Sequence, residues 1–269
     1  MYKMPKREQN SNKGTFGKVL NFCGSENYIG AAYLSAISSL KVGAGFSALA
    51  TSQGVINSVA SLLPEAVYLT REQGIEKLED FTVVLIGCGL GLKEDAKKLM
   101  EDLLLKISSN VPILIDADGL NILATGFSLD VLQDKNLILT PHPLEASRLL
   151  GVSLKYVLAY PKDAAMAITR KYNCVTVLKL HRTIICDKDL NIHVNQNGNS
   201  ALAKAGSGDV LAGVIVGLLA QRLNAFDACK LGVYLHSRAG EIASEELTEY
   251  SVMASDLPKY LHKAIKEIS

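Results

Sequence analysis

Two kinds of hydrophobic pattern alternate along this chain. The segments at residues 82–86 and 113–116 are short runs of apolar residues, which are typical of strands buried on both faces of a parallel sheet. The segments at residues 93–107 and 254–268 instead repeat their apolar positions with the period of an amphipathic helix. Strands that alternate with helices predict an α/β fold with a mainly parallel central sheet.

The remaining elements follow the same alternation over a chain of 269 residues, a length that allows one large α/β domain or two small ones, and we expect a single domain. Residues 1–13 are polar, contain Pro5 and show no periodicity, so we expect a mobile tail there. We expect further strands at residues 18–23, 46–51, 137–140, 175–179 and 184–187, and further helices at 30–42, 55–62, 120–124, 144–150, 162–172, 210–220 and 225–247.

The stretch at residues 195–221 combines a polar, glycine-rich loop with the start of a strongly apolar helix. Gly206 and Gly208 permit a positive φ and a close approach of the backbone to a ligand. The first N–H groups of a helix have no partner within it and favour an anion, so this loop predicts a cradle for a phosphoryl group. Asp209 follows it, either as the N-cap of the helix or as a general base, and the local sequence does not separate the two.

Two other glycine-containing loops follow predicted strands. Gly30 and Ala31 open a helix after the first strand, and their small side chains suit either a ligand or close packing of helix on strand. Residues 87–91, GCGLG, follow a buried strand directly. Their spacing is GxGxG rather than GxGxxG, so as a dinucleotide-binding fingerprint the loop is weak.

Charged residues also gather at predicted strand ends. Asp116 and Asp118 suit a metal ion or a sugar hydroxyl, although a helix cap is an equal reading for Asp118. His142 stands between two prolines, which hold it in place to contact a ligand or to pack the turn. Glu145 in the next helical turn could cap that helix or hold magnesium through water.

Residues 179–183, KLHRT, are basic and carry a hydroxyl, which suits phosphates, although Arg182 could equally belong to a solvated turn. In a parallel sheet the ligand crevice lies outside the carboxyl ends of the strands, so one cleft is expected to collect all these loops. They are residues 30–31, 87–91, 116–118, 142–145, 179–183 and 206–209.

Composition narrows the class of protein. The net charge of +1 gives no reason to expect a nucleic-acid partner. The five cysteines are isolated, without a CxxC pair, and Met1–Lys18 does not resemble a signal peptide, so we expect a cytoplasmic protein. The apolar run at residues 210–220 is about half the length needed to cross a bilayer, and no membrane association is expected.

Seven motifs together resemble the NAD(P)H-hydrate dehydratase family. They are NKGTFGKVL, GSENYIGAAYLSAISSLKVGAG, IGCGLG, IDADGLN, LTPHPLEASRLLG, VLKLHRT and GNSALAKAGSGDVLAG, and they run in the family's order from about residue 12 to the C-terminus. The resemblance implies a ribokinase-like fold with three α/β/α layers. It implies repair of the S-epimers of hydrated NADH and NADPH (NADHX and NADPHX), by phosphorylation of the ring hydroxyl and elimination of phosphate.

The resemblance also assigns cofactors, partners and residues. It implies Mg²⁺, ADP rather than ATP as the phosphoryl donor, a homo-oligomer of tetrameric type, and action with, or fusion to, an NAD(P)H-hydrate epimerase. Asp209 would deprotonate the substrate hydroxyl, and Glu145 could hold the metal through water. Ala31, Gly89 and His142 would contact NAD(P)HX, and Lys179, Leu180, His181, Arg182, Thr183, Gly206 and Gly208 would hold the adenine nucleotide.

The chain departs from the family pattern in three places. Asn12 replaces the usual histidine, Cys88 replaces the usual proline of the glycine loop, and residues 180–182 are bulkier and more basic than usual. The alternative function is a ribokinase-like kinase acting on a vitamin-precursor alcohol, which needs the same anion cradle and the same Asp209. A non-catalytic nucleotide sensor is a third reading, which the intact glycine frame around Asp209 disfavours.

Overall fold

One sheet organises the part of the chain that the computed structural model describes, residues 2–269. Its strand order is β3-β2-β1-β4-β5-β6-β7-β8-β9. All pairs from β3 to β7 are parallel, and β8 and β9 add an antiparallel edge. The strands are β1 (Lys18–Phe22), β2 (Phe46–Ala50), β3 (Val67–Leu69), β4 (Val83–Ile86), β5 (Ile113–Ile115), β6 (Leu137–Leu139), β7 (Cys174–Leu178), β8 (Ile184–Cys186) and β9 (Ile192–Val194).

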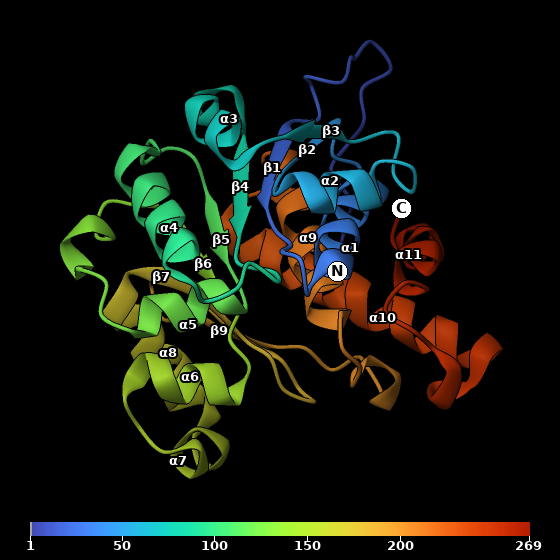
Figure 1. Ribbon diagram of the computed structural model, residues 1–269. Helices are drawn as coiled ribbons and strands as arrows, with labels where there is room; N and C mark the ends of the chain where they lie inside the picture. Colours follow the sequence, from blue (N-terminus) through green and yellow to red (C-terminus); the bar gives the residue numbers. More distant parts are fainter. Residues whose placement is uncertain (1) are drawn as a thin grey trace.

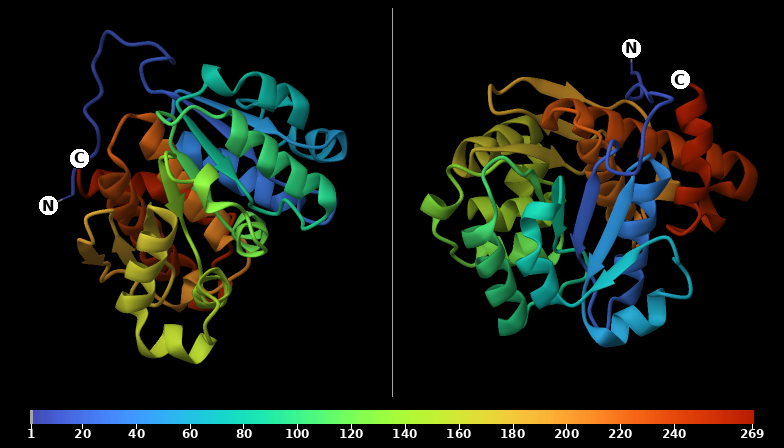
Figure 2. Two further views of the ribbon diagram at one scale, coloured as in Figure 1. Left: turned by 90° about the vertical axis from the view of Figure 1, so that its left-hand side faces the viewer. Right: turned by 90° about the horizontal axis from the view of Figure 1, so that it is seen from above.

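Helices cover both faces of this sheet and complete three layers (Figures 1 and 2). One face packs against α1 (Ile29–Lys41), α2 (Gln53–Val59), α9 (Ser207–Ala220), α10 (Ala225–Ser251) and α11 (Leu257–Lys266). The other packs against α4 (Glu94–Lys106), α5 (Asp118–Ala124), α6 (Pro143–Leu150), α7 (Leu154–Ala159) and α8 (Pro161–Tyr172), with α3 (Arg71–Glu76) beside β1 and β2. Short 3₁₀ turns span Leu78–Asp80, Leu129–Val131 and Ser200–Leu202.

The alternation of side chains along each strand divides the core into two halves. Val83 and Leu85 of β4 face the α1/α9 layer, whereas Val84 and Ile86 face the α4/α5 layer. All four are fully buried, which is why β4 is a continuous apolar run rather than an alternating one.

Helices α1 and α9 approach each other closely because α9 carries glycine at the contact. A Cβ atom added to Gly213 would lie 2.3 Å from the carbonyl oxygen of Ser35, and one added to Gly217 would lie 2.5 Å from that of Ser39. Real Cβ atoms do not come so near, so the spacing of the two helices depends on these glycines. The same glycines therefore also set the distance between the N-termini of α1 and α9.

The expected α/β architecture with a mainly parallel sheet is confirmed. The prediction missed β3, β9, α3 and α7, which are elements of three to six residues and too short for periodicity to show. All five cysteines are free and buried. None of the helices in the described residues combines the length and hydropathy that a membrane span requires.

Candidate active site

The strand order reverses between β1 and β4, because the chain passes from β1 outward to β2 and from β4 outward to β5. Such a switch point leaves a crevice outside the carboxyl ends of the two central strands. Here Gly24 follows β1, Gly87 follows β4, and the N–H of Gly24 donates to the carbonyl oxygen of Cys88 at 2.8 Å. A Cβ on Gly87 would lie 2.0 Å from the carbonyl oxygen of Asp116, so only glycine fits where these loops cross.

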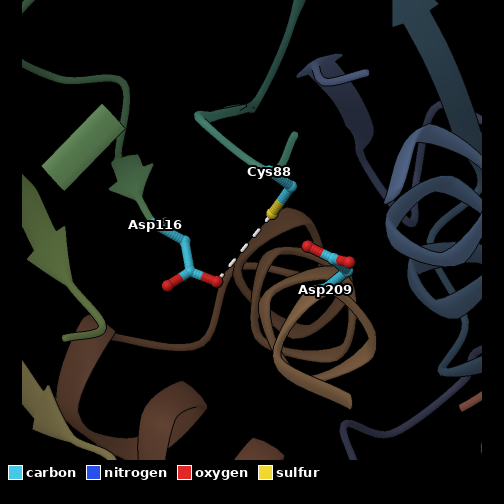
Figure 3. Close-up of side chains that lie close together, drawn as sticks. All are labelled: Cys88, Asp116 and Asp209. Carbon is cyan, nitrogen blue, oxygen red and sulfur yellow. Dashed lines mark hydrogen bonds between the residues drawn. The ribbon is translucent and has the colours of Figure 1, made fainter. Parts of the chain in front are cut away.

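Three side chains from separate elements converge at this point (Figure 3). They are Cys88 after β4, Asp116 after β5 and Asp209 in the first turn of α9, with ligand-type atoms all within 4.8 Å of one another. Asp116 is buried, and its Oδ1 accepts a hydrogen bond from Lys179 Nζ at 2.6 Å. The sheet therefore brings residues that are distant in sequence into one charged cluster.

Helix α9 begins with its first turn open toward this cluster. Gly206 is the N-cap with a φ of 90°, and no side chain caps the helix. Asp209 is the third helical residue, so the reading of Asp209 as the N-cap is wrong. The expectation of a positive φ holds for Gly206 but is wrong for Gly208, which lies within the helix. A Cβ on Gly208 would meet Lys179 Nζ at 3.5 Å and Asp116 Oδ2 at 3.8 Å, which places the backbone of Gly208 directly beside the ion pair.

Burial and the neighbouring charges shift the pKa values of Asp209 and Lys179 in this cluster. Burial, followed by the nearby carboxylate of Asp116, raises the pKa of Asp209 to about 6. Burial alone would lower the pKa of Lys179, but the carboxylates of Asp116 and Glu145 outweigh it and raise that pKa. Lys179 is therefore a stable cation beside a carboxylate that gains or loses a proton near neutral pH.

A cavity of about 600 Å³ lies on one side of the cluster. The predicted nucleotide residues Lys179, Leu180, His181, Thr183 and Gly208 all line it. His142, predicted to contact the substrate, lines the same cavity. Arg182 does not, since it lines a neighbouring cavity beside Tyr160 and Lys162, and Gly206 instead packs toward Leu34 and Ala254.

The lining of this cavity also includes His236, which the sequence analysis did not single out, together with Ser207. Ser207 Oγ and His236 Nε2 lie 3.0 Å apart, both buried, and burial lowers the pKa of His236 to about 4, so this ring is neutral. The loop at residues 197–200, which also lines the cavity, is attached to α10, because Glu241 accepts a hydrogen bond from the N–H of Gly198 at 2.6 Å. A lone histidine within a long amphipathic helix carries no sequence signal that separates a site residue from a core residue.

His142 and Glu145 form a capping box at the start of α6. His142 Nδ1 accepts from the N–H groups of Leu144 and Glu145 at 3.1 and 3.3 Å, and Glu145 Oε2 accepts from the N–H of His142 at 2.8 Å. The predicted capping role of Glu145 is therefore confirmed. Burial raises the pKa of Glu145 to about 7.

The predicted substrate residues Ala31 and Gly89 are neighbours at the other side of the cluster. A Cβ on Gly89 would lie 2.8 Å from the Cβ of Ala31, so there is no room for a side chain at Gly89 beside Ala31. The same loop continues to Gly91, whose N–H donates to Asp118 Oδ2 at 2.8 Å. Asp118 thus holds the glycine loop rather than capping α5, for which Ala117 is the N-cap.

The three α/β/α layers, the switch point of the sheet and the uncapped start of α9 together define a ribokinase-like protein. A ribokinase-like superfamily protein from Enterococcus faecalis shares this fold at a TM-score of 0.89, with 29% identity and coverage of 99% of this chain and 92% of that one. A profile of the NAD(P)H-hydrate dehydratase family matches residues 19–265, and the chain belongs to that family, as its motifs predicted.

Two individual relatives support this assignment. The ADP-dependent (S)-NAD(P)H-hydrate dehydratase of Neisseria meningitidis is 38% identical over 242 residues, covering 89% of this chain and 81% of its own length. The ADP/ATP-dependent NAD(P)H-hydrate dehydratase of Bacillus subtilis, crystallised with ATP/Mg²⁺, has a TM-score of 0.89, 30% identity and coverage of 99% and 95%. The chain spans about half the length of several bifunctional NAD(P)H-hydrate repair enzymes, 53% in Thermofilum pendens at 34% identity.

Proposed function

We propose that this chain catalyses the nucleotide-dependent dehydration of the S-epimers of NADHX and NADPHX to NADH and NADPH. The observation that carries the proposal is the half-buried carboxylate of Asp209, whose pKa is raised to about 6 beside the Lys179–Asp116 pair. A general base works best with a pKa near the operating pH, and this group meets that condition. The names of the relatives from Neisseria meningitidis and Bacillus subtilis support the choice of substrate.

In the proposed reaction Asp209 takes the proton of the ring hydroxyl, and the hydroxyl oxygen forms a bond to the terminal phosphorus of the nucleotide. The bond from that phosphorus to the bridging oxygen breaks, so ADP would leave as AMP. The ring C–O bond then breaks to release phosphate, a neighbouring ring carbon gives up a proton to solvent, and the electron pair of that C–H bond restores the double bond. The N–H groups at the start of α9, together with Lys179, face the charge that develops on the phosphoryl group.

Asp116 offers carboxylate oxygens of the kind that suits magnesium, whereas Asp209 is left free to act as the base. Mg²⁺ usually binds one or two carboxylates together with substrate phosphates, and ligand-type atoms of Asp116 and Asp209 lie within 4.8 Å of each other. The thiol of Cys88 is not a ligand that Mg²⁺ favours. Glu145 fits less well, because His142 engages both of its carboxylate oxygens. When bound, the metal neutralises phosphate charge.

ADP is the proposed donor, and the cavity beside Lys179 and Gly208 is its proposed site. The name of the Neisseria relative supports ADP, whereas the Bacillus relative is described as ADP/ATP-dependent. The tetrameric state and the cytoplasmic location also remain predictions. Action with an epimerase is supported by the bifunctional relatives.

The test is to incubate the protein with NADHX, magnesium and either ADP or ATP, and to identify every product. We expect NADH absorbance to return together with stoichiometric AMP and phosphate when ADP is the donor. A stable phosphorylated alcohol without NADH would instead indicate a kinase. Initial rates at equal, saturating nucleotide concentrations measure the donor preference, and a clear preference for ATP would contradict the choice of ADP.

A further inference from the structure

The side chain of Tyr2 joins two elements that are distant from it in sequence, β9 and α10. Its ring stacks on that of Tyr234 in α10, with ring centroids 4.4 Å apart and ring planes at 24° to each other. Its hydroxyl lies 2.9 Å from Nε2 of His193, the central residue of β9. Tyr2 therefore contacts both elements at once and connects them.

The sheet alone holds β9 weakly. The strand is three residues long, lies at the edge of the sheet and pairs with β8. Ile192 and Val194 pack toward the α4/α5 layer, so His193 points to the opposite face, where α10 lies. A cavity of about 510 Å³ opens there between Tyr2, His193 and the first turns of α10. The Tyr2 side chain thus bridges a space between the strand and the helix.

The chain that leaves β9 is attached to the same helix at further points. Three hydrogen bonds join residues 195–199 to α10: Asn195 Nδ2 donates to Ser237 Oγ at 3.0 Å, the N–H of Gly198 to Glu241 Oε1 at 2.6 Å, and Asn199 Nδ2 to Ser244 Oγ at 2.7 Å. Positions 234, 237, 241 and 244 are spaced by three or four residues, which places them on one side of α10. The contact of Tyr2 with Tyr234 is therefore the first in a series of attachments along this side of the helix.

The later attachments belong to the proposed nucleotide site. Four residues of these two segments line the cavity of about 600 Å³ beside Lys179: Asn197, Gly198, Asn199 and Ser237. The shape of this side of the cavity therefore depends on how firmly residues 195–199 are attached to α10. When only a fraction of the molecules has the binding-competent shape, the apparent affinity falls in proportion to that fraction.

We propose that Tyr2 is a positioning residue for the nucleotide site, which keeps residues 195–199 attached to α10 by joining β9 to that helix. Tyr2 itself lines other cavities, beside Leu223 and beside Ile268, and would act on the nucleotide through β9 and α10. This inference rests on the proposed function, because it takes the cavity beside Lys179 as the nucleotide site. It gives Tyr2 no part in substrate binding or proton transfer.

The test measures the binding of ADP with magnesium by calorimetry, without substrate, in four proteins. They are the wild type, Tyr2→Leu, Tyr2→Phe and the control Tyr250→Leu, which removes a tyrosine ring that is 92% exposed near the end of α10. Tyr2→Leu loses both the stacked ring and the hydroxyl, so it should raise Kd for ADP by about 10-fold. Tyr2→Phe keeps the ring and loses only the hydroxyl, so its Kd should stay within about 3-fold of the wild-type value. The control should bind ADP as the wild type does.

Hydrogen exchange shows where the effect arises. The N–H of Asn195 donates to the carbonyl oxygen of Thr183, and that of Gly198 donates to Glu241. Both N–H groups should exchange faster in Tyr2→Leu than in the wild type, because local opening of this segment becomes easier. Tyr250→Leu should leave their exchange unchanged.

Turnover separates positioning from a general loss of stability. At a temperature where thermal melting shows Tyr2→Leu to be folded, the variant should raise KM for ADP and leave kcat and the KM for NADHX nearly unchanged. Wild-type affinity for ADP in the folded variant, or wild-type exchange at residues 195–198, would overturn the proposal. If Tyr2→Leu does not fold, Tyr2→Phe decides, and an unchanged Kd together with unchanged exchange would reject the role of Tyr2.

The same measurements distinguish this inference from the function on which it rests. A wild type that binds ADP but does not convert NADHX would overturn the proposed function, while the comparison of ADP binding would still decide the role of Tyr2. A wild type that binds no ADP would overturn both.

Discussion

Helices α6 and α9 both carry an acidic residue in their first turn but differ in how that turn is capped. Each has an acid at the third helical position, Glu145 in α6 and Asp209 in α9, and burial raises the pKa of both, to about 7 and about 6. In α6 the acid closes a capping box with His142. In α9 the N-cap is Gly206, no side chain caps the helix, and the N–H groups of Gly208 and Asp209 remain available, whereas that of Ser207 donates to the carbonyl oxygen of Lys204.

The difference shows how the residue before a helix decides what the helix can do. A histidine N-cap satisfies the first N–H groups of α6 and occupies the acid, so that helix start is complete without a ligand. A glycine N-cap offers α9 no acceptor, so its N–H groups and Asp209 can act on a ligand. Four predictions follow from this contrast, in order of decreasing effect.

Asp209→Asn should remove most of the activity, by about 10²- to 10⁴-fold, because the amide cannot accept the hydroxyl proton. Binding of ADP should persist. The same base should make kcat/KM fall as the pH drops through about 6, where Asp209 becomes protonated. Initial rates of NADH formation across pH measure both effects, and turnover of the variant near the wild-type rate would exclude Asp209 as the base.

Gly208→Val should reduce turnover by about 10²-fold, because its side chain would keep the phosphoryl group away from the preorganised donors, and one such donor typically contributes about that factor. The reason is not a positive φ, because Gly208 is helical, but the filling of the space in front of Lys179 and Asp116. Gly208→Ala places only a Cβ at ordinary contact distance and should be milder. Thermal melting confirms that both variants fold, and equal kinetics for valine and glycine would place the phosphoryl cradle elsewhere.

His142→Ala should weaken binding of NADPHX more than binding of ADP and cost about 1 kcal/mol of stability through the lost N-cap. His142→Asn separates the two roles, because asparagine keeps the cap but removes the imidazole. We expect the asparagine variant to regain stability without regaining substrate affinity. Equal losses of affinity for both ligands, or no loss for either, would reject the substrate role.

Glu145→Gln should have the smallest effect, confined to the pH dependence of stability. The folded pKa of about 7 lies above the ordinary 4.5, so between these values the folded protein retains a proton that the unfolded chain has released. The free energy of unfolding therefore decreases as the pH rises from about 4.5 to about 7. Glutamine can still accept from the N–H of His142, so it should flatten this slope with little other change, and denaturant titrations at several pH values measure it. An unchanged slope would exclude Glu145 as its source.

Much of the candidate site was predictable from the sequence, and the parts that were not predictable were missed for physical reasons. The switch-point loops were found because each follows a buried apolar run, as residues 87–91 follow β4 and Asp116 follows β5. Periodicity could not show that Lys179 pairs with Asp116, since the two are 63 residues apart and only the sheet order joins them.

The roles of individual residues at helix starts were harder to predict. The sequence could not decide whether Asp209 is a helix cap or a general base, because both roles need a carboxylate near a helix N-terminus. Only the backbone angles placed it at the third helical position. Gly208 was assigned a positive φ because glycine permits it, although here glycine serves to leave space.

The close contact of α1 with α9 extends the active site into the core. Gly213 and Gly217 lie one and two helical turns beyond Asp209, yet a larger side chain at either would push apart two helices whose first turns carry Ala31 and Asp209. In a mutational scan these positions should therefore score as loss of function even in variants that remain folded. For protein engineering, the core of this layer cannot be repacked for stability without also resetting the geometry of catalysis.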